Sequence, residues 1–158
     1  MEQPDEIVVS PQTLERMNQE LAELTTSGRS EMSERLLRAR ELGDLKENAE
    51  YHSAKDAQGL MEARIRQLQY TIKNAVVREG AADTDIVGTG VIVTVKDGDE
   101  TEEYLVAQSM EEKVPGVRTI TLSSPMGRAL LGKRVGEEAI VEAPGGKFSV
   151  EIVGLRAF

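Results

Sequence analysis

The sequence predicts an α+β chain of two domains, an N-terminal antiparallel coiled-coil hairpin of α-helices and a C-terminal antiparallel β-sheet with one short helix. In the first half, apolar residues recur at spacings of three and four, which is typical of a coiled-coil seam. In the second half, runs of Val and Ile are separated by Gly, Pro and Asp, which indicates strands and turns. The apolar period is lost over 78–85, so we place the domains at 1–79 and 80–158.

The first helix is expected over 11–42. Ser10 supplies an N-cap hydroxyl, and Pro11 suits the first helical position because its missing N–H would have no partner there. Seven apolar residues form the expected seam: Leu14, Met17, Leu21, Leu24, Met32, Leu36 and Ala39. The pattern blurs over 25–28 and then resumes in a shifted phase, so a stutter or a bend is expected at that point.

The second helix follows Gly43 and has a seam of its own. Its apolar residues are Ala54, Met61, Ile65, Leu68, Ile72 and Ala75. The break at 43–45 is short, so the two helices should fold back on one another as an antiparallel hairpin. A helix over 11–42 would be about 45–50 Å long. A narrow seam buries little area per residue, so this length calls for a reason beyond stability; a dimerisation or spacer coiled coil remains an alternative.

The second half predicts strands and one short helix. The strands are expected at 90–95, 103–107, 119–122, 138–143 and 147–153. The first two flank an Asp-Gly turn within 96–100, and the last two flank 144–146, so each pair should form a hairpin. The helix should begin at Ser124-Pro125, again a cap followed by Pro, and end at Gly132.

Composition excludes several classes of protein. The chain has 19 Lys+Arg against 28 Asp+Glu, a net charge of −9, and only Tyr 3, Phe 2 and Trp 0 as aromatic residues, so free-standing nucleic-acid binding is not expected. Without Cys and with His52 as its only histidine, the chain has no thiol nucleophile and no zinc cluster of the usual type. We interpret His52 as a partly exposed helical histidine. No apolar window approaches a membrane span and the N-terminus is acidic, so a cytoplasmic location is expected.

Two carboxylates at the tip of the hairpin, near 43–48, are the strongest candidates for chemistry. If Asp44 and Glu47 lie on the first turn of the second helix, their side chains face the same side. They could share a divalent cation, because Mg²⁺ often takes only one or two protein carboxylates and its other ligands from elsewhere. The same spacing fits a capping box, with Asp44 as N-cap and Glu47 reaching back. Spacing alone favours the capping box, and the two roles are compatible.

Three stretches resemble known signatures of one protein family. They are the tip run Arg40-Glu41-Leu42-Gly43-Asp44-Leu45-Lys46-Glu47-Asn48-Ala49-Glu50-Tyr51-His52, its continuation at 58–59 and 62–65, and residues 124–133 with 144–146. They are similar to the bacterial Gre transcript cleavage factors, which are transcription elongation factors, and to the GreA type more than the GreB type. The likeness extends in order over nearly the whole chain.

The resemblance implies a mode of action. The C-terminal domain would have an FKBP-like fold, that of FK506-binding proteins, and would dock at the rim of the RNA polymerase secondary channel, while the coiled coil enters the channel. In a backtracked complex, Asp44 and Glu47 would help to hold a second Mg²⁺ and to activate a water, and the polymerase would cut its own extruded RNA 3′ end. The Mg²⁺ would be shared with polymerase and not held by the isolated protein. Such a factor is no enzyme on its own, and we expect a monomer without membrane contact.

The resemblance also implies contact residues. Polymerase docking maps to Ser123, Ser124 and Pro125, where many relatives have Asn or an acid in place of Ser123. RNA contacts map to Arg38 and Lys55; without the resemblance, these basic residues would be interpreted as partners in solvated ion pairs.

Three other functions remain to be weighed. A Gre-like paralogue could occupy the channel and inhibit or modulate transcription without stimulating cleavage, although the intact pair of Asp44 and Glu47 favours cleavage. A peptidyl-prolyl isomerase or chaperone needs an aromatic-lined pocket, and only Tyr104, Phe148 and Phe158 follow residue 80. A purely structural coiled-coil adaptor would not require acids at the tip.

Overall fold

The computed structural model describes residues 6–44, 47–78 and 83–157, which form two compact units. Among these residues, 14–75 make up the first unit, and 6–13 join 76–157 in the second. The expected boundary at 79/80 falls outside the described residues. Within the described ranges, no helix combines the length and the apolar character that crossing a membrane requires.

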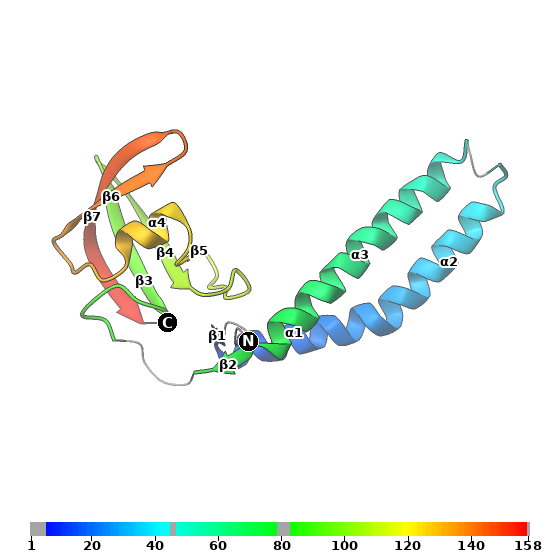
Figure 1. The fold of residues 1–158 in the computed structure, drawn as a ribbon, viewed down its shortest axis with the longest axis horizontal. Helices are drawn as coiled ribbons and strands as arrows, with labels where there is room; N and C mark the ends of the chain where they lie inside the picture. Colours follow the sequence, from blue (N-terminus) through cyan, green and yellow to red (C-terminus); the bar gives the residue numbers. More distant parts are fainter. Residues whose placement is uncertain (1–5, 45–46, 79–82, 158) are drawn as a thin grey trace, which may run out of the picture. The chain divides into compact units, whose positions relative to one another are not determined.

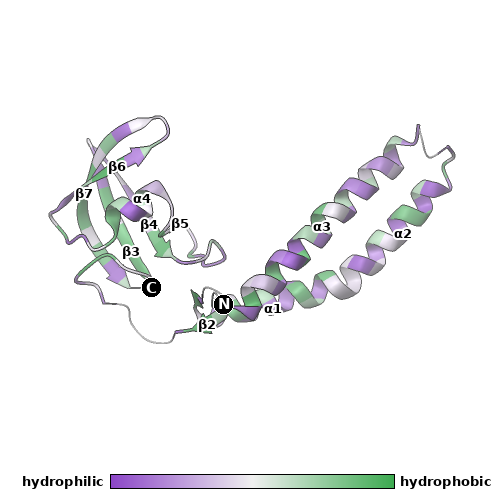
Figure 2. Cartoon of the chain, in the orientation of Figure 1, coloured by the Kyte–Doolittle hydropathy of each residue, from purple (hydrophilic) through white to green (hydrophobic). Residues whose placement is uncertain are grey.

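The first unit is a helical hairpin, as expected (Figure 1). Helix α1 (Pro11–Glu23) continues through a π-helix, η1 (Leu24–Gly28), into α2 (Arg29–Arg40), and α3 (Ala49–Lys73) returns alongside α2. Apolar and polar residues alternate along these helices in Figure 2, and six seam residues are buried: Met17, Leu36, Ala39, Ala54, Ile65 and Leu68. The irregularity expected over 25–28 is confirmed, since the π-helix lies there.

Two Arg–Glu pairs connect the continuous path of α1, η1 and α2, called the first helical path here, to α3. Arg64 Nε and Nη2 donate to the two carboxylate oxygens of Glu20, each at 2.8 Å. Arg29 Nε and Nη2 donate to the carboxylate of Glu62 at 3.0 and 3.1 Å. The hydrogen bond from Arg29 lowers the pKa of Glu62 and raises that of the guanidinium. Both pairs lie at the hairpin surface, where ion pairs are screened by solvent and salt.

Acid should weaken the hairpin partly through Glu62. Because its folded pKa is lower than its unfolded pKa, its stabilising effect is present above the unfolded value of about 4.3 and is lost as the pH falls through the folded value. Glu62→Gln should therefore lower the melting temperature slightly at pH 7 and reduce the further loss on acidification. Thermal unfolding followed by circular dichroism at several pH values measures both effects. Equal acid sensitivity of variant and wild type would contradict this role.

The second unit contains a five-stranded sheet in the order β5-β4-β3-β7-β6. Its strands are β3 (Val91–Asp97), β4 (Glu100–Ala107), β5 (Arg118–Thr121), β6 (Glu138–Ala143) and β7 (Gly146–Ala157). Helix α4 (Pro125–Leu130) contributes Leu130 to a core that includes Val93, Val106 and Ile152, each of them fully buried. The five strands and the short helix are confirmed. The sheet is mixed, however, because β5 runs parallel to β4. Residues 108–117 connect the two strands and are long enough to carry the chain back to the starting end of β4.

A small sheet of β1 (Ile7–Val9) and β2 (Ala75–Val77) was not expected. Ala75, assigned above to the helical seam, lies in β2 because α3 ends at Lys73. Residues 6–13 are held within the second unit by side chains that follow β4. Gln108 Oε1 accepts a hydrogen bond from Val8 N at 2.9 Å, and the carboxylate of Glu112 accepts from both N and Oγ of Ser10. Glu112 is only 5% exposed, so these bonds form away from solvent.

Candidate functional site

The loop that joins α2 to α3, residues 41–48, forms the tip of the hairpin and is called the tip loop here. Helix α2 ends at Arg40, and Glu41 N still donates to Leu37 O at 3.3 Å. Gly43 then adopts φ 127°, a conformation that side chains with a Cβ rarely take, so the chain can leave the helix sharply.

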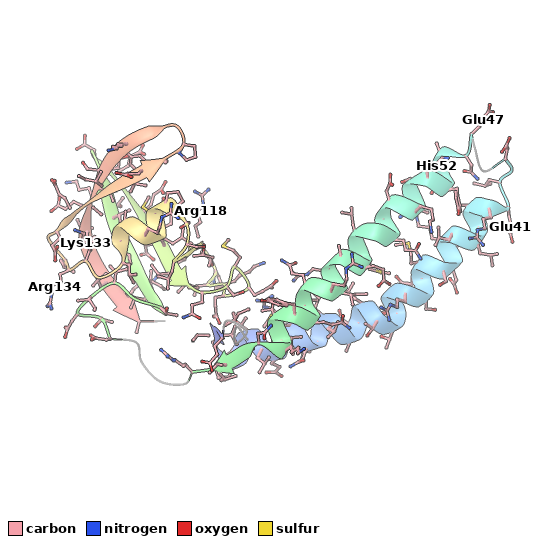
Figure 3. All side chains as sticks on the ribbon, viewed as in Figure 1. Glu41, Glu47, His52, Arg118, Lys133 and Arg134 are labelled. Carbon is pink, nitrogen blue, oxygen red and sulfur yellow. The ribbon has the colours of Figure 1, made fainter. Side chains whose placement is uncertain are left out.

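Asp44 and Glu47 both lie on the tip loop, outside α2 and α3, and both are exposed. Figure 3 shows the Glu47 side chain pointing outward from the end of the hairpin. The expectation that both acids occupy the first turn of the second helix is therefore wrong. The expectation of a capping box with Asp44 as N-cap of the second helix is also wrong, because the N-cap of α3 is Asn48. Leu45 and Lys46, which stand between the two acids, lie outside the described residues. Neither acid is the N-cap of α3.

Asn48 starts α3 in their place. Its Oδ1 accepts from Tyr51 N at 3.0 Å, and its Nδ2 donates to Ala39 O, at the end of α2. Asn is as favourable at an N-cap as Asp, and its amide adds a donor that a carboxylate lacks. One side chain thus caps one helix and ties it to the other. The sequence signal was present, since an N-cap residue type stands directly before the helical run at Ala49.

Replacing Asn48 should separate these two roles. Asn48→Asp keeps the cap but loses the bond to Ala39 O, whereas Asn48→Ala loses both and should cost about 1–2 kcal/mol of hairpin stability. Denaturant unfolding measures both variants, and Asp should be intermediate between Ala and wild type. If Asp matched Ala, the cap would contribute nothing.

Aromatic contacts support the base of the tip loop. The guanidinium carbon of Arg40 lies 5.7 Å from the ring centroid of Tyr51, and the rings of Tyr51 and His52 meet edge to face with centroids 5.9 Å apart. His52 is exposed on the first turn of α3, in agreement with its interpretation as a surface histidine. The contact between Arg40 and Tyr51 was not predicted from the sequence, because the two residues are eleven positions apart and meet only when the hairpin closes.

The donor set at the tip fits part of a Mg²⁺ site. Among the described residues, no group of three or more His, Cys, Asp or Glu side chains is placed to hold a metal. Two exposed carboxylates match the one or two protein ligands that Mg²⁺ often takes, with water or another molecule supplying the others. Asp44 and Glu47 are therefore suited to completing a site that a partner begins.

The two basic residues assigned to RNA lie on the hairpin surface. Arg38, on α2, pairs with Glu34 at 3.6 Å and its side chain is 74% exposed. Lys55, on α3, donates to Gln58 Oε1 at 3.0 Å. Exposed pairs of this kind contribute little to stability, so both cations can exchange their partners at low cost.

The second candidate region is the turn between β5 and α4. Ser124 is the N-cap of α4: its Oγ accepts from Gly127 N at 3.1 Å and donates to Thr121 O at 2.7 Å, and Pro125 is the first helical residue. The expected helix start is confirmed. Ser123 is exposed, and its carbonyl accepts a hydrogen bond from Arg128. The turn therefore presents Ser123 on a backbone that is held at both ends.

Gly127 explains why this turn is so tightly closed, although nothing in its sequence neighbourhood distinguishes it. A Cβ at this position would lie 2.0 Å from Thr121 O and 2.9 Å from Thr121 C, which no side chain permits. The glycine lets α4 approach the end of β5 backbone to backbone. Only the tertiary contact reveals this requirement, because the residue lies in an ordinary short helix.

The aromatic residues weighed for an isomerase pocket do not strengthen that function. Tyr104 is packed in the core of the second unit, where burial and its hydrogen bond to Glu102 raise the pKa of its phenol. Phe148 lies on β7 and is 41% exposed. Phe158 lies outside the described residues.

Comparison with known proteins gives matches over both halves. Residues 7–77 match the family model described as transcription elongation factor, N-terminal, and residues 82–157 match transcription elongation factor, GreA/GreB, C-term. A transcription elongation factor GreA of Bacillus cytotoxicus is 42% identical over 146 residues, covering 90% of this chain and 91% of the relative. One of Geobacillus kaustophilus has the same identity and coverage.

Solved structures match over nearly the full length. The crystal structure of GreA factor homolog 1 (Gfh1) of Thermus thermophilus is 28% identical, covers 96% of this chain and 99% of its own, and has a TM-score of 0.45. A second structure, of the transcription factor Gfh1, is 27% identical with a TM-score of 0.49 and covers 97% and 99% of the two chains.

Proposed function

This chain belongs to the GreA/GreB family of transcription elongation factors, and we propose that it binds RNA polymerase, inserts its hairpin into the secondary channel and stimulates the Mg²⁺-dependent cleavage of backtracked RNA by the polymerase. The observation that carries this proposal is the position of Asp44 and Glu47: two exposed carboxylates on the tip loop, outside both helices. Both side chains are exposed at the end of the hairpin, where a partner can reach them.

The hairpin supplies reach. Helix α3 has 25 residues, which span about 37 Å at 1.5 Å per residue. The tip acids are carried at the far end of this length. The net charge of −9 would be repelled by bare nucleic acid but is compatible with a positively charged channel.

The residues of this chain would position the Mg²⁺ and the RNA, and the active centre of the polymerase would cleave the RNA. A bound Mg²⁺ stabilises the attacking and leaving oxygens in phosphodiester cleavage and lowers the pKa of a coordinated water. Asp44 and Glu47 would provide carboxylate oxygens for it, and Asn48 would hold the base of the loop through Ala39 O. Arg38 and Lys55 would meet phosphates of the extruded RNA 3′ end. Ser123, Ser124 and Pro125 would dock on the rim of the channel.

Under this proposal the protein has no catalytic activity of its own, since two carboxylates are an incomplete metal site. The test is RNA cleavage in a defined backtracked polymerase complex with Mg²⁺, with and without the protein, beside polymerase-free RNA. We expect cleavage to accelerate about 100-fold or more in the complex and RNA to stay intact without polymerase. RNA hydrolysis by the protein alone would overturn the accessory role. Binding without acceleration would instead indicate the channel-occupying regulator.

A further inference from the structure

The heptad pattern of the first helical path contains one residue too many. Continued from Leu21 and Leu24 by alternating steps of four and three, the seam would fall at 28, 31, 35 and 38. Those positions hold Gly28, Glu31, Arg35 and Arg38. The apolar residues Met32, Leu36 and Ala39 each stand one position later. Leu36 and Ala39 are buried, at 8% and 1% exposure, so the later positions are the ones that pack.

The π-helix absorbs this extra residue. Its hydrogen bonds reach one residue further back than those of an α-helix, as in the bond from Arg29 N to Leu24 O. One residue corresponds to about 100° of rotation in an α-helix, so without η1 the far part of α2 would turn its charged positions into the seam. The facing seam of α3 keeps its steps of four and three from Met61 to Ile72. Figure 1 shows that the helical path changes direction between α1 and α2.

Three consecutive hydroxyls of the π-helix donate back to carbonyls of the preceding turn. Thr25 Oγ1 donates to Leu21 O at 2.8 Å, Thr26 Oγ1 to Ala22 O at 2.6 Å and Ser27 Oγ to Glu23 O at 3.1 Å. Each acceptor is the carbonyl four residues back, which the residue's own N–H would bond in an α-helix. Hydroxyl bonds of this kind compete with the backbone N–H groups for the same carbonyls and bend helices. Three of them in a row therefore favour a departure from the regular α-helix at this point.

Two ion pairs enclose the segment. Glu20, before η1, pairs with Arg64, and Arg29, directly after η1, pairs with Glu62. Arg64 and Glu62 are two residues apart on α3. Both sides of the π-helix are thus tied to the same stretch of the opposite helix, which keeps the extra residue between them.

We propose that Thr25, Thr26 and Ser27 are positioning residues for the tip acids. They hold the extra residue within η1, so that α2 reaches the tip in the phase that buries Leu36 and Ala39. Asp44 follows α2 and Glu47 precedes α3, so the phase of α2 against α3 decides how the two carboxylates face each other. The effect on RNA cleavage rests on the proposed function; the effect on helix phase does not.

The first test uses the isolated protein. In T25V/T26V/S27A, hydrogen exchange of the backbone amides over 32–39 should be about tenfold faster or more, because the extra residue can shift toward the tip. The control T25S/T26S keeps every hydroxyl and should match wild type. Deleting residue 26 from the hydroxyl-free variant removes the extra residue itself and should restore protection. Inserting one Ala after Thr26 in the wild type raises the excess over the heptad pattern to two residues, and it should abolish the protection of these amides.

The second test adds the same variants to the backtracked polymerase complex. The hydroxyl-free variant should lose about tenfold or more of the cleavage acceleration while still competing with wild type for polymerase. Deleting residue 26 from that variant should restore the acceleration within about twofold of wild type. Unchanged exchange and cleavage in the hydroxyl-free variant, or failure of the deletion to restore either, would overturn the positioning role. If the wild type does not accelerate cleavage, the proposed function fails, and the exchange experiment still decides the role of the hydroxyls in helix phase.

Discussion

Replacing Asp44 by Asn and Glu47 by Gln together should reduce the stimulation of RNA cleavage by about 100-fold or more. The amides keep the size and shape of the side chains but remove the negative charge that a divalent cation requires. Because Asn48 is the N-cap of α3, the hairpin should keep its stability when both acids become amides. Cleavage rates in backtracked complexes at saturating factor, together with thermal unfolding of the free protein, measure the two expectations.

A matched variant separates position from charge. Glu41 and Glu50 are also exposed near the tip, and changing both to Gln removes the same two charges. This control should retain cleavage stimulation within a few-fold, because Glu41 is the C-cap of α2 and Glu50 lies in the first turn of α3. Equal losses in the two double variants would mean that the total negative charge of the tip matters, and would refute a specific role for Asp44 and Glu47.

The second large effect is expected at Gly127. A Cβ there would penetrate the carbonyl of Thr121, so Gly127→Ala must push α4 away from the end of β5. Overpacking of this kind costs about 1–3 kcal/mol and sometimes more, and contact with backbone places this site at the upper end, about 3 kcal/mol. The second unit should then melt about 10 °C lower or more. Because the displaced turn carries Ser123 and Ser124, affinity for polymerase should fall with it.

Gly145→Ala is the control for this change. A Cβ added to Gly145, in the same unit, would meet no atom within 4 Å, so its replacement should leave the melting temperature nearly unchanged. Differential scanning calorimetry compares the two variants, and a polymerase competition assay measures docking. A stable Gly127→Ala protein with unchanged docking would show that α4 can move without consequence for the turn.

Local signals predicted most of the fold. The two seams, the helix starts at Ser10 and Ser124 and the strand runs depend on neighbours a few residues away. These elements are confirmed, except that Ala75 lies in β2 and not in the second seam. The parallel pairing of β4 with β5 and the sheet of β1 with β2 depend on contacts between distant segments, which periodicity does not contain. The requirement for glycine at position 127 also depends on a distant contact, because the end of β5 leaves no space for a side chain there.

The tip was predicted in its residues but not in its geometry. Spacing favoured a capping box, whereas Asn48 takes the cap and leaves Asp44 and Glu47 on the loop. Two N-cap residue types, Asp44 and Asn48, stand four positions apart, and local propensity ranks them about equally. The bond from Asn48 to Ala39 O decides between them, and it exists only when the hairpin is closed. The catalytic and docking assignments remain predictions.

The second unit is discontinuous along the chain, and this has a consequence for how it is made. Val8 and Ser10 bond to Gln108 and Glu112, partners 100 and 102 positions away. During synthesis, at about 5–20 residues per second, the first strand must wait several seconds for these partners to appear. If the hairpin folds in that interval, it brings the chain at Ser10 close to that at Val76 and shortens the loop that remains to be closed. A fragment that begins at residue 76 would lack β1, so an independently folding C-terminal domain should be built by joining 6–13 to 76–158 through a short linker.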